Sequence, residues 1–227
     1  MTNIIEIKNL SKIYKERQKI KVLNKINYKF KKGKIYSLMG PSGSGKSTLL
    51  NLLSLIDHPT SGTIKFNNEN INYNKNSLND EVRAKNIGII YQEKNLLNDF
   101  TALENVYLAR LTSELNKQKA VKDSMNILKN VGLAKRFNHY PSEMSGGEAQ
   151  RVAISRAIIN SPKVILADEP TGSLDHKTSK AIFKQIFKLK NKNRIIIYAT
   201  HNRYFANMAD CKIQLVNGKI KTINDRF

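Results

Sequence analysis

Apolar residues follow two different periods along the chain, and the changes of period predict where strands and helices lie. Short β-branched runs bounded by turn residues predict strands, at residues 4–7, 22–30, 34–38, 63–66, 87–91, 163–167 and 194–199. Helical spacing predicts helices at 47–56 and 181–189. Strands that alternate with helices in this way are typical of an α/β layer fold with a largely parallel sheet.

The stretch between Gln92 and Pro162 lacks this strand pattern. Its apolar residues recur at helical spacing, for example from Val121 to Val131, and Gly132 follows as a stop signal. We predict a helical subdomain at approximately residues 93–161, inserted into one domain that spans residues 1–227. A polar, asparagine-rich loop is expected at 67–79, and a hairpin at 213–223 with its turn at positions 217–218.

Composition limits the compartment and the kind of protein. No run approaches the roughly 18–20 apolar residues that a membrane-spanning helix needs, and the N-terminus lacks the pattern of a secretory signal. Cys211 is the only cysteine, which excludes an intrachain disulfide and a cysteine-cluster metal site. We expect a protein of the cytoplasm that does not span a bilayer by itself.

The formal net charge of +21 has two interpretations. It could report binding to nucleic acid or to an anionic membrane surface. Lysine and asparagine are, however, scattered along the whole chain, as a general compositional bias would produce. Because no aromatic RNA-binding motif or zinc finger accompanies the charge, the sequence favours the second interpretation, and nucleic acid is not an expected partner.

A glycine-rich loop joins the strand predicted at 34–38 to the helix that follows. It matches the P-loop pattern G-x-x-x-x-G-K-[ST] with Gly40, Pro41, Ser42, Gly43, Ser44, Gly45, Lys46, Ser47 and Thr48. Glycines let backbone N–H groups surround phosphates, and a helix N-terminus adds partial positive charge. Lys46 would neutralise the β- and γ-phosphate oxygens, and the Ser47 hydroxyl would ligate Mg²⁺. The alternative is a glycine-rich turn without a ligand.

Two carboxylates follow the apolar strand predicted at 163–167. Asp168 would hold Mg²⁺ through water, and Glu169 would act as the general base that polarises the attacking water. Taken alone, the pair could equally be a solvated turn before Pro170. With a P-loop upstream in the same chain, the pair indicates a P-loop NTPase.

A second phosphate-binding helix start lies between these two motifs. The run Ser145, Gly146 and Gly147, followed by Glu-Ala-Gln-Arg and an apolar helical pattern, resembles the signature motif of ABC ATPases. An ordinary N-capped helix is the alternative. The resemblance implies that this turn binds the ATP held by the opposite subunit, so that the protein works as a homodimer.

The resemblance to ABC ATPases covers essentially the whole chain and assigns further residues. It implies that Tyr14 stacks on adenine, that Gln92 contacts Mg²⁺ and the attacking water, that Asp175 lies in a loop crossing the dimer interface, and that His201 holds the γ-phosphate. The alternatives are a strand-edge tyrosine, a loop amide and a structural histidine.

The fold implied by this resemblance is the ABC ATPase fold. It is an α/β P-loop NTPase fold with a RecA-like core, an N-terminal antiparallel β subdomain and an inserted α-helical subdomain. ATP and Mg²⁺ are the implied cofactors.

Within the family, three stretches resemble the branch of the lipoprotein-releasing, macrolide-exporting and division-associated ATPases: YQEKNLLNDFTALENV, PSEMSGGEAQRVAISRA and LADEPTGSLD. This implies an ATPase subunit at the cytoplasmic face of the inner membrane, bound to transmembrane permease subunits on separate chains. Lipoprotein release is the nearest function, and a macrolide-type exporter or a regulatory ATPase that gates a membrane partner without transport are the alternatives. Glu93, Lys94 and Asn95 depart from the branch pattern, at the place where the family meets its membrane partner.

Overall fold

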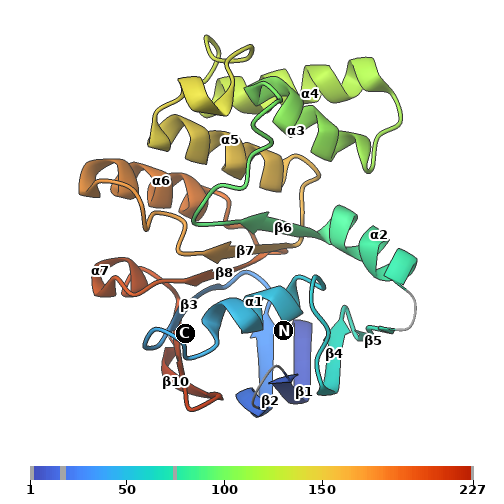
Figure 1. Cartoon of the computed structure of the whole chain (residues 1–227), viewed down its shortest axis with the longest axis vertical. Helices are drawn as coiled ribbons and strands as arrows, with labels where there is room; N and C mark the ends of the chain where they lie inside the picture. Colours follow the sequence, from blue (N-terminus) through green and yellow to red (C-terminus); the bar gives the residue numbers. More distant parts are fainter. Residues whose placement is uncertain (1–2, 16–18, 74–75, 226–227) are drawn as a thin grey trace. The chain divides into compact units, whose positions relative to one another are not determined.

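The computed structural model describes residues 3–15, 19–73 and 76–225 (Figure 1). The chain forms two compact units. The first unit comprises Met1–Arg83 and Lys190–Phe227, and the second comprises Ala84–Leu189. No helix in the described ranges has the length and apolarity needed to cross a membrane.

The first unit contains an antiparallel sheet with the strand order β2-β1-β4-β5. Its strands are β1 (Asn3–Lys15), β2 (Lys19–Lys31), β4 (Ser61–Phe66) and β5 (Glu69–Asn70). One face of β1 and β2 is apolar and buried, which explains why the alternating pattern folds as strands: Ile5, Ile7, Leu10, Leu23, Ile26 and Phe30 are at most 2% exposed. The predicted N-terminal β subdomain and its strands at 22–30 and 63–66 are confirmed, whereas the strand predicted at 4–7 continues to Lys15.

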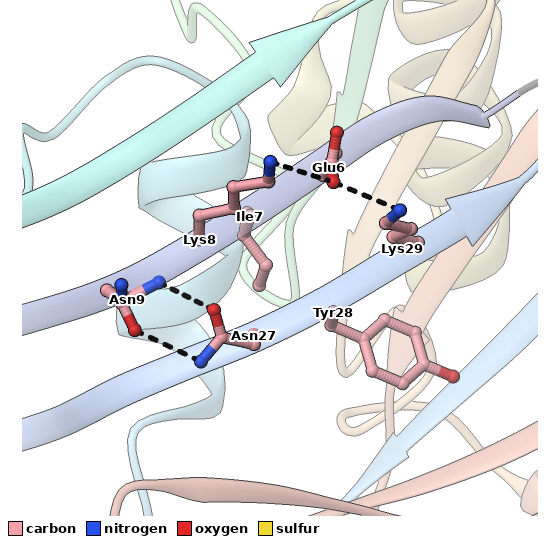
Figure 2. A pocket seen from close by; sticks show the side chains of 7 residues that line it. All are labelled: Glu6, Ile7, Lys8, Asn9, Asn27, Tyr28 and Lys29. Carbon is pink, nitrogen blue, oxygen red and sulfur yellow. Dashed lines mark hydrogen bonds and ion pairs between the residues drawn. The ribbon is translucent and has the colours of Figure 1, made fainter.

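The outer surface of β1 and β2 is polar and irregular (Figure 2). The carboxylate of Glu6 lies 3.6 Å from Lys8 Nζ and 3.2 Å from Lys29 Nζ. Asn9 adopts a positive φ of 50°, its N–H donates to Asn27 Oδ1 at 2.9 Å, and the pairing register shifts between Ile7 and Leu10. A side-chain amide thus replaces the strand partner that the bulge removes.

Parallel strands in the first unit carry the predicted P-loop, residues 40–48, here called the phosphate loop. β3 (Ile35–Met39) lies between β8 (Ile195–Ala199) and β9 (Cys211–Val216), parallel to both, and β10 (Lys219–Asp225) pairs antiparallel to β9. The β9–β10 turn has φ of 49° at Asn217 and 69° at Gly218, as a two-residue hairpin turn requires. These strands and the hairpin are confirmed.

The helices of this region differ from the prediction at two places. α1 (Lys46–Leu53) ends three residues early, because Ser54 caps it and Leu55 turns into a left-handed conformation with a φ of 60°. The predicted loop at 67–79 was wrong in part, since it contains β5 and the start of α2 (Asn76–Asn86), while residues 74 and 75 lie outside the described ranges. Sequence periodicity missed α2 because this helix has almost no apolar face. A short α7 (Arg203–Ala206) follows β8.

The second unit combines two parallel strands with helices. β6 (Ile87–Ile90) pairs with β7 (Val164–Asp168). The helices are α3 (Ala102–Leu111), α4 (Lys117–Asn130), the 3₁₀ turn η1 (Pro141–Glu143), α5 (Gly146–Ile158) and α6 (His176–Lys188). All but α6 fall within residues 93–161, but the compact unit is larger, so a separate helical subdomain with those bounds stays a prediction.

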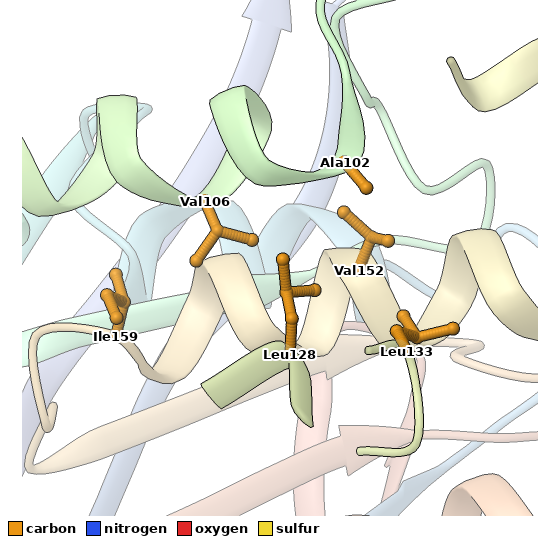
Figure 3. Packing of buried hydrophobic residues seen from close by; sticks show 6 residues of the cluster. All are labelled: Ala102, Val106, Leu128, Leu133, Val152 and Ile159. Atoms are coloured by element: carbon orange, nitrogen blue, oxygen red, sulfur yellow. The ribbon is translucent and has the colours of Figure 1, made fainter. Parts of the chain in front are cut away.

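A buried apolar cluster holds α3, α4 and α5 together (Figure 3). It consists of Ala102, Val106, Leu128, Leu133, Val152 and Ile159, which are at most 7% exposed. α4 presents Leu128 to the cluster and ends at Asn130, and Gly132 follows with a positive φ of 79°. The predicted stop signal is confirmed.

Leu128→Ala should destabilise the protein by about 2–5 kcal/mol, because the substitution leaves a cavity among three helices. Leu115→Ala is the matched control, since Leu115 is 96% exposed, and it should change the stability by less than about 0.5 kcal/mol. Urea unfolding followed by circular dichroism measures both. Equal effects of the two substitutions would show that the cluster does not stabilise this unit.

Candidate functional site

The phosphate loop connects β3 to α1, in the strand–loop–helix context that the sequence predicted. Two of its glycines are required by close contacts. A Cβ at Gly40 would lie 2.4 Å from the carbonyl oxygen of Leu215, and one at Gly45 would lie 2.7 Å from Cγ1 of Val22. Gly45 also caps α1 with a positive φ of 97°. The backbone can therefore turn sharply into the helix and leave its amides accessible.

The lysine of the loop lies folded over it. Lys46 Nζ donates to the carbonyl oxygens of Gly40 and Pro41, both at 3.0 Å. Ser47 is exposed at the start of α1, whereas the leucines at 49, 50, 52 and 53 anchor the helix in the core. A charged group, a hydroxyl and unpaired helix amides thus converge on one exposed loop, which is what phosphate binding needs.

His201 lies at the same edge of the parallel strands as the phosphate loop. β8 runs parallel to β3, and the N–H of Thr200 donates to the carbonyl oxygen of Leu38 at 3.2 Å. His201 follows directly and is exposed. The carboxyl ends of neighbouring parallel strands are where α/β proteins bind ligands.

The second unit brings three predicted residues to one strand edge. β7 ends at Asp168, and Glu169 follows with a left-handed φ of 43°. β6 runs parallel to β7, so Gln92 emerges at the same end. The side chain of Gln92 covers Gly172, where an added Cβ would lie 2.9 Å from its Nε2. Two carboxylates and an amide are therefore neighbours in this unit.

The signature turn is a fully formed helix cap. Ser145 Oγ accepts the N–H of Glu148 at 3.3 Å, and Glu148 Oε2 accepts the N–H of Ser145 at 2.9 Å. Arg136 Nε donates to Glu148 Oε1 at 2.9 Å. The hydrogen bonds from Ser145, together with Arg136, lower the pKa of Glu148 to about 2. Glu148 is thus ionised and holds the exposed Ser145 in one conformation.

The loop containing Asp175 packs against this turn. A Cβ at Gly146 would lie 3.0 Å from Cδ2 of Leu174, and one at Gly147 would lie 2.7 Å from Cγ2 of Thr178. Asp175 caps α6, because its carboxylate accepts the N–H of Thr178 at 3.0 Å. Hydrogen bonds from Thr178 lower the pKa of Asp175. The structure therefore brings Asp175 and the glycines of the signature together.

Sequence reasoning missed Arg156, which fixes the segment that follows Gln92. Arg156 lies in α5, and its guanidinium donates to the carbonyl oxygens of Lys94 at 2.9 Å and of Asn95 at 2.7 Å. Both acceptor residues have positive φ, 60° and 47°. Burial lowers the pKa of Arg156. The available signal was a charged residue inside an otherwise apolar helical run.

Asn105 fixes the next part of the same segment and was also missed. It is 1% exposed, accepts the N–H of Leu97 at 2.8 Å, and donates to the carbonyl oxygens of Leu97 at 3.0 Å and Phe100 at 2.9 Å. An asparagine within a helix such as α3 does not indicate from sequence alone that its side chain bonds the backbone of the preceding loop. Residues 94–101, here called the anchored segment, are held by two helices.

Comparison with known proteins agrees with this geometry. The sequence model of the ABC transporter family matches residues 23–172. The lipoprotein-releasing system ATP-binding protein LolD is 42% identical in Rickettsia bellii, over 96% of this chain and 97% of that protein. LolD of Wigglesworthia glossinidia brevipalpis is 43% identical over 96% of both chains. An uncharacterized ABC transporter ATP-binding protein of Methanocaldococcus jannaschii is 42% identical over 97% of this chain and 99% of that protein.

A solved structure shares the fold. The ATP-binding cassette MJ0796, a dimer in a post-hydrolysis state with ADP and Pi, superposes with a TM-score of 0.88 at 35% identity, over 97% of this chain and 99% of that chain. The chain therefore belongs to the ABC transporter family and has the ABC ATPase fold, as predicted. It is an ATPase subunit of the branch that includes LolD.

Glu148→Gln should lower stability at pH 7 and lose that effect in acid. The pKa of Glu148 falls from its usual 4.5 to about 2 on folding, so its carboxylate stabilises the fold above pH 4.5 and ceases to do so as the pH falls toward 2. Urea unfolding of both proteins between pH 7 and pH 3 measures the difference. A difference that stays constant over this range would contradict the assigned ionisation.

Arg156→Ala should free the anchored segment, because two carbonyl groups lose a charged donor. The expected loss of stability is about 2–4 kcal/mol, and hydrogen exchange should accelerate in a peptide covering residues 92–101. Arg156→Lys should restore part of the protection, since an ammonium can reach one carbonyl but lacks the planar fork. Unchanged exchange in that peptide would show that the segment is held by other contacts.

Proposed function

We propose that this ATPase works as a homodimer in which each ATP lies between the phosphate loop of one protomer and Ser145–Gly147 of the other. The observation that carries the proposal is that two helices begin at glycines, α1 directly after Gly45 and α5 at Gly146 and Gly147, and that these helices belong to different compact units. The dimeric cassette with ADP and Pi, which is similar over nearly its whole length, supports this assembly.

The residues at the phosphate loop have defined roles in the proposal. Lys46 neutralises the β- and γ-phosphate oxygens, the amides from Gly40 to Thr48 surround the phosphates, and Tyr14 stacks on the base. His201 holds the γ-phosphate. The positions of Lys46 over the loop and of His201 beyond the neighbouring strand support these assignments.

The donor set fits a magnesium ion. Ser47 offers a hydroxyl, Gln92 an amide oxygen and Asp168 a carboxylate, and Mg²⁺ prefers such oxygen ligands together with waters and phosphates. When bound, the ion would neutralise charge on the β- and γ-phosphates. Ser47, Gln92 and Asp168 are the residues that would hold it.

Glu169 carries the chemical step of ATP hydrolysis in the proposal. Glu169 accepts a proton from water, the oxygen of that water attacks the γ-phosphorus in line, and the bond to the β-phosphate oxygen breaks to leave ADP and phosphate. Asp175 would lie in a loop that crosses the dimer interface, and its position beside the signature turn supports this role. Loss of the γ-phosphate removes the contact that favoured the closed dimer, so the protomers separate.

The proposed setting is a membrane complex at the cytoplasmic face of the inner membrane, where permease subunits on other chains follow this motion. Lipoprotein release is the proposed activity, supported by the LolD proteins that are 42–45% identical to this chain. ATP-dependent release of a lipoprotein from vesicles that carry the complex tests it. Export of a small molecule, or gating without any transport, would contradict it.

Glu169→Gln should trap the closed dimer, because ATP still binds while proton removal from water is lost. Hydrolysis should fall by about 100-fold or more, and size-exclusion chromatography at saturating Mg-ATP should show a dimer. Lys46→Ala in the same background should return the monomer by abolishing triphosphate binding. Monomers only in the Glu169→Gln protein would contradict the shared site.

A mixed dimer provides the geometric control for this prediction. One subunit carries Ser145→Arg and the other Lys46→Ala, so that a site shared between subunits remains intact once per dimer. Residual hydrolysis is expected from the mixture, and neither variant alone should show any. Activity of the Ser145→Arg homodimer equal to that of the wild type would exclude a role for this turn.

A further inference from the structure

A network of polar contacts ties the end of β1 to the turn that follows α1. Tyr14 Oη donates to Asp57 Oδ2 at 3.1 Å. Lys12 Nζ donates to Asp57 Oδ1 at 2.6 Å and to the carbonyl oxygen of His58 at 2.8 Å. Tyr14, Lys12 and Asp57 are here called the Asp57 brace.

The brace is charged and partly shielded from water. The side chains of Lys12 and Asp57 are 12% and 28% exposed. Burial acts to raise the pKa of Asp57, but hydrogen bonds from Lys12, His58 and Tyr14 outweigh it and hold the pKa below its usual value. Ionised partners make these hydrogen bonds stronger than neutral ones.

The brace leaves the Tyr14 ring little freedom. Its hydroxyl is bound at the tip, and Lys12 Nζ lies 4.9 Å from the ring centroid, over one face. A base can therefore stack only on the other face. Nearby, Thr60 accepts the N–H of Ile13 at 2.9 Å and its own N–H donates to Ser11 at 2.9 Å, so the strand is held on both sides of Lys12.

The same turn is rigidly attached to the phosphate-binding helix. The backbone N–H groups of Ile56 and Asp57 both donate to the carbonyl oxygen of Asn51, at 3.1 and 3.2 Å, and Asn51 belongs to α1. α1 begins at Lys46, directly after the phosphate loop. A continuous set of hydrogen bonds thus leads from the aromatic ring to the helix that receives the phosphates.

We propose that Lys12 and Asp57 are positioning residues for nucleotide binding: they fix the Tyr14 ring relative to α1, so that the base and the phosphates of one nucleoside triphosphate are bound at the same time. This inference rests on the nucleotide site proposed above. Ordering a free side chain on binding would weaken affinity by about 2- to 12-fold, and the brace removes that cost in advance.

The experiment uses two ligands to distinguish an effect on binding of the base from an effect on binding of the phosphates. Dissociation constants are measured by calorimetry for the non-hydrolysable analogue adenylyl imidodiphosphate and for inorganic tripolyphosphate, which has no base. Tyr14→Phe removes only the hydroxyl, and Asp57→Ala removes its acceptor together with the Lys12 ion pair. Asp123→Ala is the matched control, since Asp123 also loses one ion pair, with Arg110 at 3.1 Å, but lies in the second unit, which does not contain the brace.

Tyr14→Phe and Asp57→Ala should each weaken binding of the adenine nucleotide by about 2- to 12-fold and leave binding of tripolyphosphate within about twofold. Tyr14→Phe should have no further effect in the Asp57→Ala protein, because the two residues act through one contact. Asp123→Ala should bind both ligands like the wild type.

Other outcomes overturn the inference. If Tyr14→Phe binds the nucleotide like the wild type while Tyr14→Ala does not, the ring stacks without needing the brace. If the variants weaken binding of both ligands equally, the brace stabilises the fold in general and does not act specifically on binding of the base. Failure of the nucleotide site itself looks different, because Lys46→Ala would then leave both dissociation constants unchanged.

Discussion

Access to backbone N–H groups at a helix N-terminus is the constraint on which this protein depends. Those amides have no partner within the helix, and they can reach an anion only if no side chain stands in the way. At α1, Gly40 and Gly45 let the loop approach Leu215 and Val22 more closely than a Cβ would allow, so that the backbone turns directly into the helix start. At α5, Gly146 and Gly147 pack closely against Leu174 and Thr178, and Glu148 fixes the position of Ser145. Strands, caps and anchoring leucines all serve to present these two helix starts.

Much of the fold could be predicted because its signals are local. Buried strands such as β7 and β8 appear as apolar runs, and the turn at 217–218 follows from an Asn-Gly pair that accepts positive φ. The phosphate loop and the carboxylates after β7 were predictable for the same reason. α2 was not, because its stability does not come from an apolar stripe, and sequence periodicity detects only such stripes.

The residues that position the site were the least predictable. The contacts of Arg156 are with carbonyl groups 61 and 62 positions away, and those of Asp57 are with side chains 43 and 45 positions away, so both residues depend on tertiary structure. Asn105 bonds to groups only 4 to 8 positions away. These residue types are common on protein surfaces, so the sequence does not separate Asn105 and Asp57 from solvated side chains, and only Arg156 gave a signal, as a charge within an apolar helical run. Periodicity and motif spacing predict which groups carry the chemistry, whereas the fold decides which groups hold them in place.

Arg156 recognises main-chain carbonyl groups, and this has an evolutionary consequence for residues 93–95. Glu93 and Asn95 are exposed, and nothing in the bonds from Arg156 depends on the side chain at 94 or 95. Side chains that tolerate a positive φ can therefore replace those at 94 and 95 without breaking the attachment of the backbone to α5, the helix that Ser145 caps. Evolution can thus vary this exposed surface while its backbone keeps one fixed conformation.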